Sequence, residues 1–435
     1  MIRNRAALER SPAHRVALDC VAAGIEAAHP RRVVRDRVAL DGDTLAVGDA
    51  TYDLGDYREV VVLGGGKAAA GVAAALEAVL GDRLDGGAVV TDAPADTEGV
   101  AVLAGDHPVP GEESVAGTRE VLARADDAGA GTLVLAVLTG GGSALLAAPA
   151  VDLDTMRETT EALLESGATI HEVNAVRKHL SAVKGGQLAR RAAPATVVTL
   201  ALSDVVGNDL DVIASGPTVP DTTTFDDALD ALDRHDVQVP ASARDRLERG
   251  ARGEVAETPG ADDPAVAAAD AHVLADGFTA LAAARDAVPD EYGTLVLSSR
   301  VRGEAREAAL THAAVAEECR ATGNPIAPPA VVLSGGETTV TVAGGGTGGP
   351  NLEFGLRAAI ELDDATLAAV DTDGRDGSTD AAGALVDGGT VGDPAAALAA
   401  LAANDVHPYL ADRDALVETG ATGTNVNDLR VLVVE

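Results

Sequence analysis

The chain has 435 residues, a length that allows two or three domains, each with a hydrophobic core of its own. Its formal net charge of -36, from 69 acidic and 33 basic side chains, argues against nucleic-acid phosphates and anionic membrane surfaces as partners. An acidic chain with few lysines and 2% aromatic residues is typical of adaptation to a high-salt cytoplasm, where dense ions screen self-repulsion.

No stretch approaches the length of a transmembrane helix, and the two cysteines, Cys20 and Cys319, fit neither a disulfide framework nor a zinc pattern. His171 and His179 lie eight residues apart on one predicted helix but lack a third ligand, so no metal site is expected there. We therefore expect a cytoplasmic protein that binds neither nucleic acid nor membranes.

The first predicted elements lead to a glycine-rich turn. Residues 6–28 have the apolar spacing of a helix, and residues 33–47 that of short strands or a hairpin. The apolar, β-branched run 60–63 then ends at three glycines, Gly64, Gly65 and Gly66. A helical pattern over 68–80 follows them. This junction is where α/β proteins hold phosphates or carboxylates, since glycines let backbone N–H groups approach an anion.

The same pattern returns further along the chain. A buried strand at 132–138 ends in Gly140, Gly141, Gly142 and Ser143, followed by a helix at 153–166. Asn174 could cap a helix that carries Arg177 and Lys178. A strand at 196–202 delivers Ser203 and Asp204 to its carboxyl end, and the alternation of strands and helices predicts a parallel sheet with ligands at those ends.

Residues 249–264 lack an apolar period and are the expected linker to a second α/β domain. Strands are expected in that domain at 271–275, 294–298, 330–334, 338–342 and 367–370. Two further glycine clusters, 335–336 and 344–349, follow strands or open a helix. Four such clusters in two domains indicate a ligand rich in phosphate, although one alone could be a structural turn.

Only three lysines occur in the chain, and each lies next to glycines or in a polar cluster: Lys67, Lys178 and Lys184. Their placement suggests that an ammonium group is needed at those points. Acidic residues gather after predicted strands, namely Asp204, Asp371, Asp373 and Asp376. Carboxylates there could hold Mg²⁺ against phosphates or accept a proton from a hydroxyl, or they could be ordinary turn residues.

The first glycine cluster has features of two nucleotide-binding motifs. A Walker-type P-loop does not fit, because Ala68 follows Lys67 where Ser or Thr is required. The pattern G-x-G-x-x-A does fit Gly64, Gly66 and Ala69, with an acid for a ribose contact at Asp82 or Asp85. A dinucleotide-dependent dehydrogenase therefore remains an alternative.

Taken together, the motifs resemble those of the class II glycerate 2-kinases. In the first half these are LGGGKAA at 63–69, TGGGSALL at 139–146, NAVRKHLS at 174–181 with KGG at 184–186, SDV at 203–205 and SGPT at 215–218. The second half, with LSGGET at 333–338, GGPNLE at 348–353, DTDGRDG at 371–377 and TGTNVND at 422–428, is similar to the MOFRL domain of these kinases. Members commonly have Arg and Gln where this chain has Pro350 and Leu352. The acidic composition is like that of haloarchaeal proteins.

The resemblance implies two α/β domains with the active site in the cleft between them. The first, residues 1–248, would be a Rossmann-like three-layer domain with a parallel sheet. After the linker at 249–264, residues 265–435 would form a smaller α/β domain containing the MOFRL region at about 328–433. The implied reaction is ATP-dependent phosphorylation of D-glycerate at its 2-hydroxyl, giving 2-phosphoglycerate and ADP, with Mg²⁺ or another divalent cation. Whether the protein is a homodimer stays open.

The family motifs also imply roles for individual residues. Lys67 and Asp204 would be catalytic. The substrate and its phosphate would be bound by Gly64, Gly65, Gly66, Gly141, Gly142, Ser143, Asn174, Arg177, Lys178, Lys184, Ser215 and Thr218. The nucleotide would be bound by Gly335, Gly336, Glu337, Gly348, Gly349, Asn351, Thr424 and Asn425. The metal would be held by Asp373 and Asp376.

Two alternatives stay open. Some relatives carry the name hydroxypyruvate reductase, which only the G-x-G-x-x-A match supports in this sequence. The chain could also be a non-catalytic small-molecule-binding protein, although such a protein has no need of a proton acceptor like Asp204.

Overall fold

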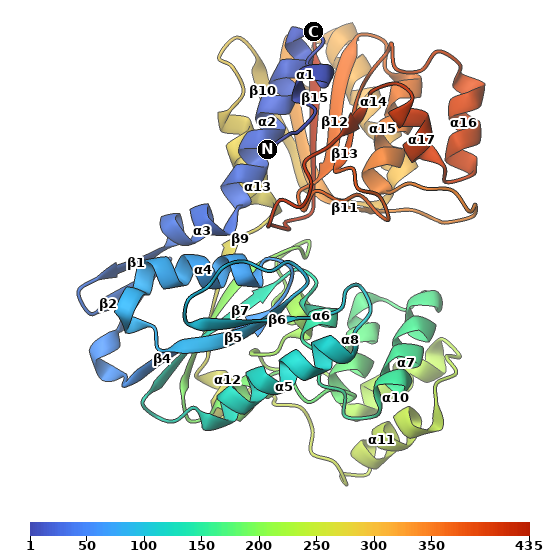
Figure 1. Cartoon of the computed structure of the whole chain (residues 1–435). Helices are drawn as coiled ribbons and strands as arrows, with labels where there is room; N and C mark the ends of the chain where they lie inside the picture. The colour runs from blue at the N-terminus through green and yellow to red at the C-terminus, as the bar shows by residue number, and fades with distance from the viewer. The chain divides into compact units, whose positions relative to one another are not determined.

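The computed structural model describes residues 1–435 and divides them into two compact units (Figure 1). One unit is Val33–Leu274, and the other joins Met1–Arg32 to Ala275–Glu435. Each unit is an α/β domain with a six-stranded sheet and a buried core, which confirms the predicted fold class. No helix has both the length and the apolar composition needed to cross a bilayer.

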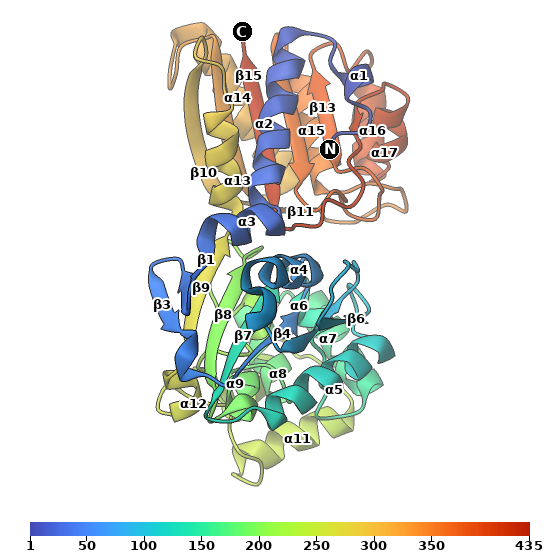
Figure 2. The same cartoon turned by 60° about the vertical axis from the view of Figure 1, so that its left-hand side comes forward.

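The expected domain boundaries differ from this division. Helix α2 (Pro12–Ala28) packs on β15 (Asp428–Val434) and β12 (Ala365–Asp371), so the N-terminus belongs to the second unit (Figure 2). Strand β9 (Asp270–Ala275), expected in the second domain, instead lies beside β8 (Thr196–Leu202) in the first sheet. The spacing of apolar residues predicts an element but does not say which sheet it joins.

The expected linker at 249–264 lies inside the Val33–Leu274 unit. It contains the last turn of α11 (Ala241–Ala251) and a loop that is tied down by a bond from Thr258 Oγ1 to Asp221 Oδ2 of 2.9 Å. A lack of apolar period therefore marked a loop within a domain rather than a boundary between domains.

The sheet of the Val33–Leu274 unit has the strand order β6-β5-β4-β7-β8-β9. Strands β4 to β8 pair in parallel. Because the chain runs outward from the centre in both directions, the order reverses between β4 and β7, the place where open α/β sheets bind ligands. The other strands of this sheet are β4 (Glu59–Gly65), β5 (Gly86–Thr91), β6 (Val100–Ala104) and β7 (Thr132–Thr139).

Helices cover this sheet, and a small antiparallel sheet precedes it. The small sheet is β1 (Val38–Asp41), β2 (Thr44–Val47) and β3 (Ala50–Asp53). The remaining helices are α3 (Pro30–Arg37), η1 (Leu54–Asp56), α4 (Ala69–Leu80), η2 (Gly81–Arg83), α5 (Glu112–Asp127), α6 (Gly142–Leu145), α7 (Leu153–Glu165), α8 (Ile170–His179), α9 (Gln187–Ala192), η3 (Ile213–Ser215), α10 (Phe225–Arg234) and α12 (Pro264–Ala267). Helices α7, α8, α10 and α11 share a separate apolar cluster around Phe225.

The second unit has a mixed sheet in the order β10-β11-β15-β12-β13-β14, in which β15 runs antiparallel to both of its neighbours. Its remaining strands are β10 (Gly293–Glu304), β11 (Ala330–Thr339), β13 (Gly383–Asp387) and β14 (Leu416–Val417). Its helices are α1 (Arg5–Leu8), α2, α13 (Gly277–Asp286), α14 (Ala305–Thr322), α15 (Pro350–Glu361), α16 (Pro394–Ala402) and α17 (Val406–Ala411). Helices α2 and α13 cover one face, and α14 and α15 cover the other.

Candidate active site at the carboxyl ends of the first sheet

Three loops with predicted site residues leave the first sheet at the same edge. Gly65 of β4 is paired with Leu138 of β7, and Thr139 is paired with Leu202 of β8. The glycine clusters at 64–66 and 140–142 and the Ser203-Asp204 loop therefore begin in adjacent positions. They lie at the carboxyl ends of the strands, as the sequence predicted, and the two glycine clusters flank the point between β4 and β7 where the strand order reverses.

The first glycine cluster is shaped by contact with the neighbouring strand. Gly64 has a φ of +152°, and a Cβ there would lie 1.9 Å from the Val137 carbonyl oxygen. Gly66 has a φ of +135°, and a Cβ would lie 2.2 Å from Thr139 Oγ1. Only glycine allows this approach of two strands at these backbone angles.

The N–H groups of this cluster are already bound within the protein. Gly66 N donates to Val90 O at 3.0 Å, Lys67 N to Gly140 O at 2.8 Å, and Ala68 N to Thr139 Oγ1 at 3.1 Å. The N–H groups of Gly66 and of the two residues after it are therefore not available to bind an anion in this structure. Sequence alone cannot separate a glycine that exposes its N–H from one that makes room for a neighbouring strand.

The second glycine cluster has backbone N–H groups that no acceptor of the protein occupies. Gly141 has a φ of +77°, and its N–H and those of Gly142 and Ser143 donate to no acceptor in the protein. A Cβ on Gly141 would lie 3.1 Å from Lys67 Cγ and 3.0 Å from His107 Cδ2, so the Lys67 stem and the His107 ring flank this loop. Lys67 is half-buried. His107, which is not among the predicted site residues, thus lies beside the candidate site.

Lys184 stabilises this loop through hydrogen bonds to backbone carbonyl oxygens. Its side chain is fully buried, and Nζ donates to the carbonyl oxygens of Ser143 at 2.9 Å, Leu146 at 3.2 Å and Ala214 at 3.5 Å. Burial, together with the nearby charge of Arg177, lowers the pKa of Lys184 to about 7. No carboxylate contacts it, so its role is to fix the loop backbone.

Helix α8 supplies two of the predicted residues on one face. Thr169, not Asn174, caps this helix, and Asn174 lies within it. Asn174 Oδ1 accepts a hydrogen bond from Ser215 Oγ at 3.0 Å, and Ser215 Oγ lies 3.4 Å from Ser143 Oγ. Arg177 follows three residues later on the same helix and is half-buried; burial lowers the pKa of its guanidinium.

Lys178 and Thr218 turn into the protein interior. Lys178 is completely buried and pairs with Asp211 and with Asp221, the latter at 3.2 Å. Thr218 Oγ1 is buried against Thr199 Oγ1 at 2.7 Å. Sequence reasoning missed both aspartates, because their distance along the chain from Lys178 gives no sign of contact. The structure thus gives Lys178 protein partners in place of a substrate contact.

Asp204 lies two residues beyond the end of β8 and is half-buried. The preceding residue, Ser203, shapes the turn, because its Oγ accepts from Val205 N and donates to Val205 O, both at 3.2 Å. Asp204 is therefore on the same sheet edge as Lys67 and the Gly141–Ser143 loop.

In the second unit, the predicted residues form a buried polar network. Asp376 Oδ1 accepts from Asn351 N at 2.9 Å and Oδ2 from Leu352 N at 2.8 Å, so this carboxylate caps α15. Asn351 Nδ2 also donates to Asp428 Oδ1 at 2.6 Å, and Arg430, fully buried, pairs with Asp428. Asp428 and Arg430 were not predicted as a pair, although a charge inside the apolar run 428–434 was a visible signal.

Asp371, Asp373 and Asp376 do not form a ready-made metal site. The structure contains no group of three or more His, Cys, Asp or Glu side chains that could hold a metal ion. Both oxygens of Asp376 are used in capping, and burial raises its pKa to about 7. Burial, with the charges of Asp373 and Asp428, raises the pKa of Asp371 well above its usual range. Asp376 therefore does not fit the predicted role of metal ligand.

The other predicted nucleotide residues lie on different parts of this unit. Gly335 and Gly336 lie inside β11, and a Cβ on Gly336 would lie 2.1 Å from Val301 O. Thr424 is buried and donates to Ala28 O at 2.7 Å. Gly348 precedes the α15 N-cap residue Gly349, and Glu337 is exposed. Asn425 is buried, and its Oδ1 accepts from Asn427 N at 3.2 Å. Pro350 begins α15, and Leu352 lies in the core.

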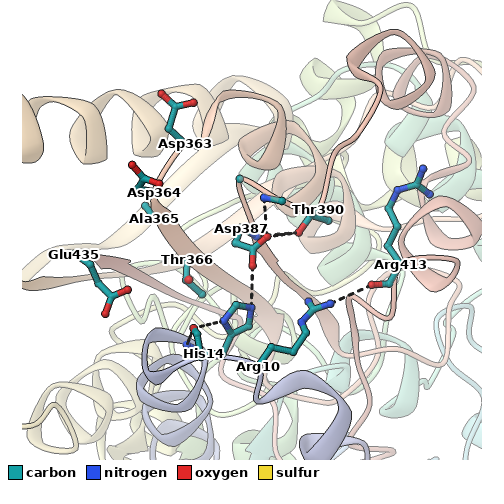
Figure 3. Close-up of a pocket in the computed structure, with 13 residues that line it drawn as sticks. Arg10, His14, Asp363, Asp364, Ala365, Thr366, Asp387, Thr390, Arg413 and Glu435 are labelled. Carbon is teal, nitrogen blue, oxygen red and sulfur yellow. Dashed lines mark hydrogen bonds and ion pairs between the residues drawn. The ribbon is translucent and has the colours of Figure 1, made fainter.

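A separate cavity of about 620 Å³ lies in the second unit (Figure 3). It is at the end of the sheet where β12 begins, opposite to the end where Asp371 and Asp428 lie. His14 of α2 and Asp387 at the end of β13 meet there, with Nε2 and Oδ2 3.2 Å apart (Figure 3). The hydrogen bond from His14 lowers the pKa of Asp387 to about 2. No predicted site residue lines this cavity, and the contact between His14 and Asp387 joins α2 to β13.

Comparison with known proteins covers nearly the whole chain. Residues 16–248 match the family described as a domain of unknown function (DUF4147), and residues 330–428 match the MOFRL family. A glycerate 2-kinase from Pyrococcus horikoshii is 39% identical over 96% of this chain and 97% of its own. A putative hydroxypyruvate reductase from Agrobacterium vitis is 43% identical over 86% of this chain and 87% of its own. The crystal structure of a glycerate kinase from Thermotoga maritima superposes with a TM-score of 0.82, at 36% identity, over 97% and 99% of the two chains.

Proposed function

The chain belongs to the family of glycerate kinases that combine a DUF4147 region with a C-terminal MOFRL domain, and we propose that it phosphorylates D-glycerate with ATP. The product would be 2-phosphoglycerate, and the reaction would take place in the cytoplasm at high salt. The observation that carries the proposal is the grouping of Lys67, the open N–H groups of Gly141–Ser143 and Asp204 at one sheet edge.

Phosphoryl transfer needs positioning and neutralisation of charge more than covalent chemistry. In this proposal the Lys67 ammonium and the N–H groups of Gly141, Gly142 and Ser143 stabilise the oxygens of the transferring phosphoryl group. Asp204 orients the acceptor hydroxyl and takes its proton. Lys184, which bonds the carbonyl oxygens of Ser143 and Ala214, keeps the loop in shape without touching the substrate.

ATP is the co-substrate that the family implies, and the second unit would contribute to its binding. We propose Gly348, Glu337 and Asn425 for contacts with the nucleotide, because the family motifs imply them and they form none of the hydrogen bonds that link Asp376, Asn351, Asp428 and Arg430. A divalent cation such as Mg²⁺ would arrive with the nucleotide, because Mg²⁺ is usually held by one or two carboxylates plus substrate phosphates. Asp373, half-buried at the end of β12, is the carboxylate we assign to it.

The positions of Asp82 and Asp85, the candidate ribose contacts, argue against the reductase alternative. A ribose contact requires a carboxylate at the edge of the sheet where the glycines lie. Asp82 and Asp85 instead precede β5, and Asp85 Oδ2 accepts from Val60 N at 2.8 Å near the start of β4. Asp92 does follow β5 at the correct edge, but the N–H groups of residues 66–68 are bound within the protein and are not available to a pyrophosphate.

The experiment that tests this function is a coupled ADP-release assay in molar KCl with D-glycerate, ATP and Mg²⁺. A parallel reaction contains hydroxypyruvate with NADH or NADPH. Release of ADP that depends on D-glycerate, with no nicotinamide oxidation, is the expected result. Oxidation of nicotinamide without ADP release would replace the kinase with the reductase, and D-glycerate binding with neither reaction would indicate a binding protein.

A further inference from the structure

Arg177 is a cation without an acidic partner in a very acidic protein. The chain has 69 acidic and 33 basic side chains, and many arginines elsewhere form ion pairs, such as Arg191 with Asp126. Arg177 is half-buried and forms no hydrogen bond or ion pair with any protein group. A guanidinium kept from most of the solvent and left unpaired is costly, unless an anion that binds there compensates for it.

A second cation lies close to Arg177, and it also lacks a carboxylate. Lys184 is fully buried and contacts only three carbonyl oxygens, and the charge of Arg177 acts on it directly. Two basic side chains therefore lie near one another, and neither contacts a carboxylate of the protein. An anion bound beside Arg177 would be attracted by both.

Asn174 adds a donor without an acceptor. Its side chain is 2% exposed, Oδ1 accepts from Ser215 Oγ, and Nδ2 has no hydrogen-bond partner. Buried polar groups are nearly always satisfied, so an unused donor one helical turn from Arg177 indicates an acceptor that is supplied from outside.

The backbone at Ala214 and Ser215, which places Ser215 Oγ against Asn174, has an unfavourable conformation. Ala214 and Ser215 have φ values of 50° and 62°, in the left-handed region that non-glycine residues rarely adopt. Such strain tends to occur at functional sites. Here it brings Ser215 Oγ to both Asn174 and Ser143, which links the Asn174–Arg177 pair to the Gly141–Ser143 loop.

We propose that Asn174 and Arg177, with the Ser143 and Ser215 hydroxyls, bind the carboxylate of the acceptor, a small 2-hydroxy acid, and so determine specificity. This proposal rests on the proposed kinase function. The carboxylate carbon of such an acid is bonded to the carbon that carries the 2-hydroxyl. Anchoring the carboxylate next to the Gly141–Ser143 loop thus brings the 2-hydroxyl, rather than the 3-hydroxyl, toward Lys67. Lys184 is a positioning residue in this arrangement.

The test is the variant Arg177→Met, with Arg191→Met as the matched control, because Arg191 is an exposed arginine of the same unit paired with Asp126. We expect Arg177→Met to raise the KM for D-glycerate about 100-fold, to weaken D-glycerate binding measured by calorimetry equally, and to leave the KM for ATP within twofold. The control should change none of these values. Glycerol, which lacks the carboxylate, should be used equally poorly by both variants.

A second variant, Asn174→Leu, keeps the branched shape of the side chain but removes the unused Nδ2 donor, together with the Oδ1 acceptor of Ser215 Oγ, and should raise the KM for D-glycerate about 10-fold. Circular dichroism and thermal unfolding establish that each variant is folded. An unchanged D-glycerate affinity, or a raised KM for ATP instead, in Arg177→Met would overturn the carboxylate assignment while the kinase function stands. A wild-type protein that releases no ADP would instead refute the kinase function itself.

Discussion

The Lys178→Met variant separates a structural lysine from a catalytic one. Lys178 is completely buried and pairs with Asp211 and Asp221; the Asp221 side chain is completely buried as well. Removing one partner of a buried ion pair typically costs about 3–5 kcal/mol, because the remaining charge is left uncompensated. Asp221 keeps hydrogen bonds from Thr223 and Thr258, so we expect a loss near the lower end, about 3 kcal/mol.

The assay is equilibrium urea unfolding at constant, molar KCl, which screens surface pairs but leaves a buried pair largely intact. The double variant Lys178→Met with Asp221→Asn should recover part of the loss, because no buried charge then remains at position 221. For the folded fraction, the KM for D-glycerate should stay within about threefold of the wild type. A variant with normal stability and a greatly raised KM for D-glycerate would refute the structural role and restore the substrate contact predicted from sequence.

Three further variants test the site. Lys67→Ala should lower kcat about 10²- to 10³-fold with little change in unfolding free energy, and steady-state kinetics with normal activity would remove Lys67 from the reaction. Asp204→Asn should lower kcat about 10²- to 10⁴-fold with the KM for ATP unchanged; an unaffected kcat would exclude Asp204 as proton acceptor. Lys184 has a folded-state pKa of about 7, below the 10.5 of the free side chain, so between these values the unfolded chain binds a proton that the folded chain does not. Wild-type stability relative to Lys184→Met should therefore rise with pH from about 7, by about 1.4 kcal/mol per pH unit, and equal pH dependence in urea titrations would show that this pKa is not lowered.

Local patterns in the sequence predicted the elements that carry the candidate site. The runs at 60–63 and 132–138 became β4 and β7, and the helical pattern after the first glycine cluster became α4. The parallel sheet and the position of the loops at one edge followed from the alternation of strands and helices. The scarcity of lysine also indicated special positions, since two of the three lysines are fully buried.

What the sequence could not predict depends on contacts between distant residues. The apolar pattern at 6–28 does not reveal that α2 covers the sheet of the C-terminal unit, whose strands are formed by residues 293–434. Nor does the Gly-rich pattern show that the N–H groups of residues 66–68 are already bound, or that Lys178 meets Asp211 and Asp221. Donor satisfaction and ion pairing are properties of the packed structure, and they decide which polar groups can bind a ligand.

The most direct test of the central claim is the ³¹P NMR spectrum of the product formed from D-glycerate, ATP and Mg²⁺ in molar KCl. Phosphorylation of the 2-hydroxyl links the phosphorus through oxygen to a carbon with one hydrogen and gives a doublet, which is the result we predict. A triplet would show transfer to the 3-hydroxyl and contradict the anchoring of the carboxylate beside the Gly141–Ser143 loop. The absence of any phosphorylated acid would contradict the assignment of the Lys67 and Asp204 edge as a kinase site.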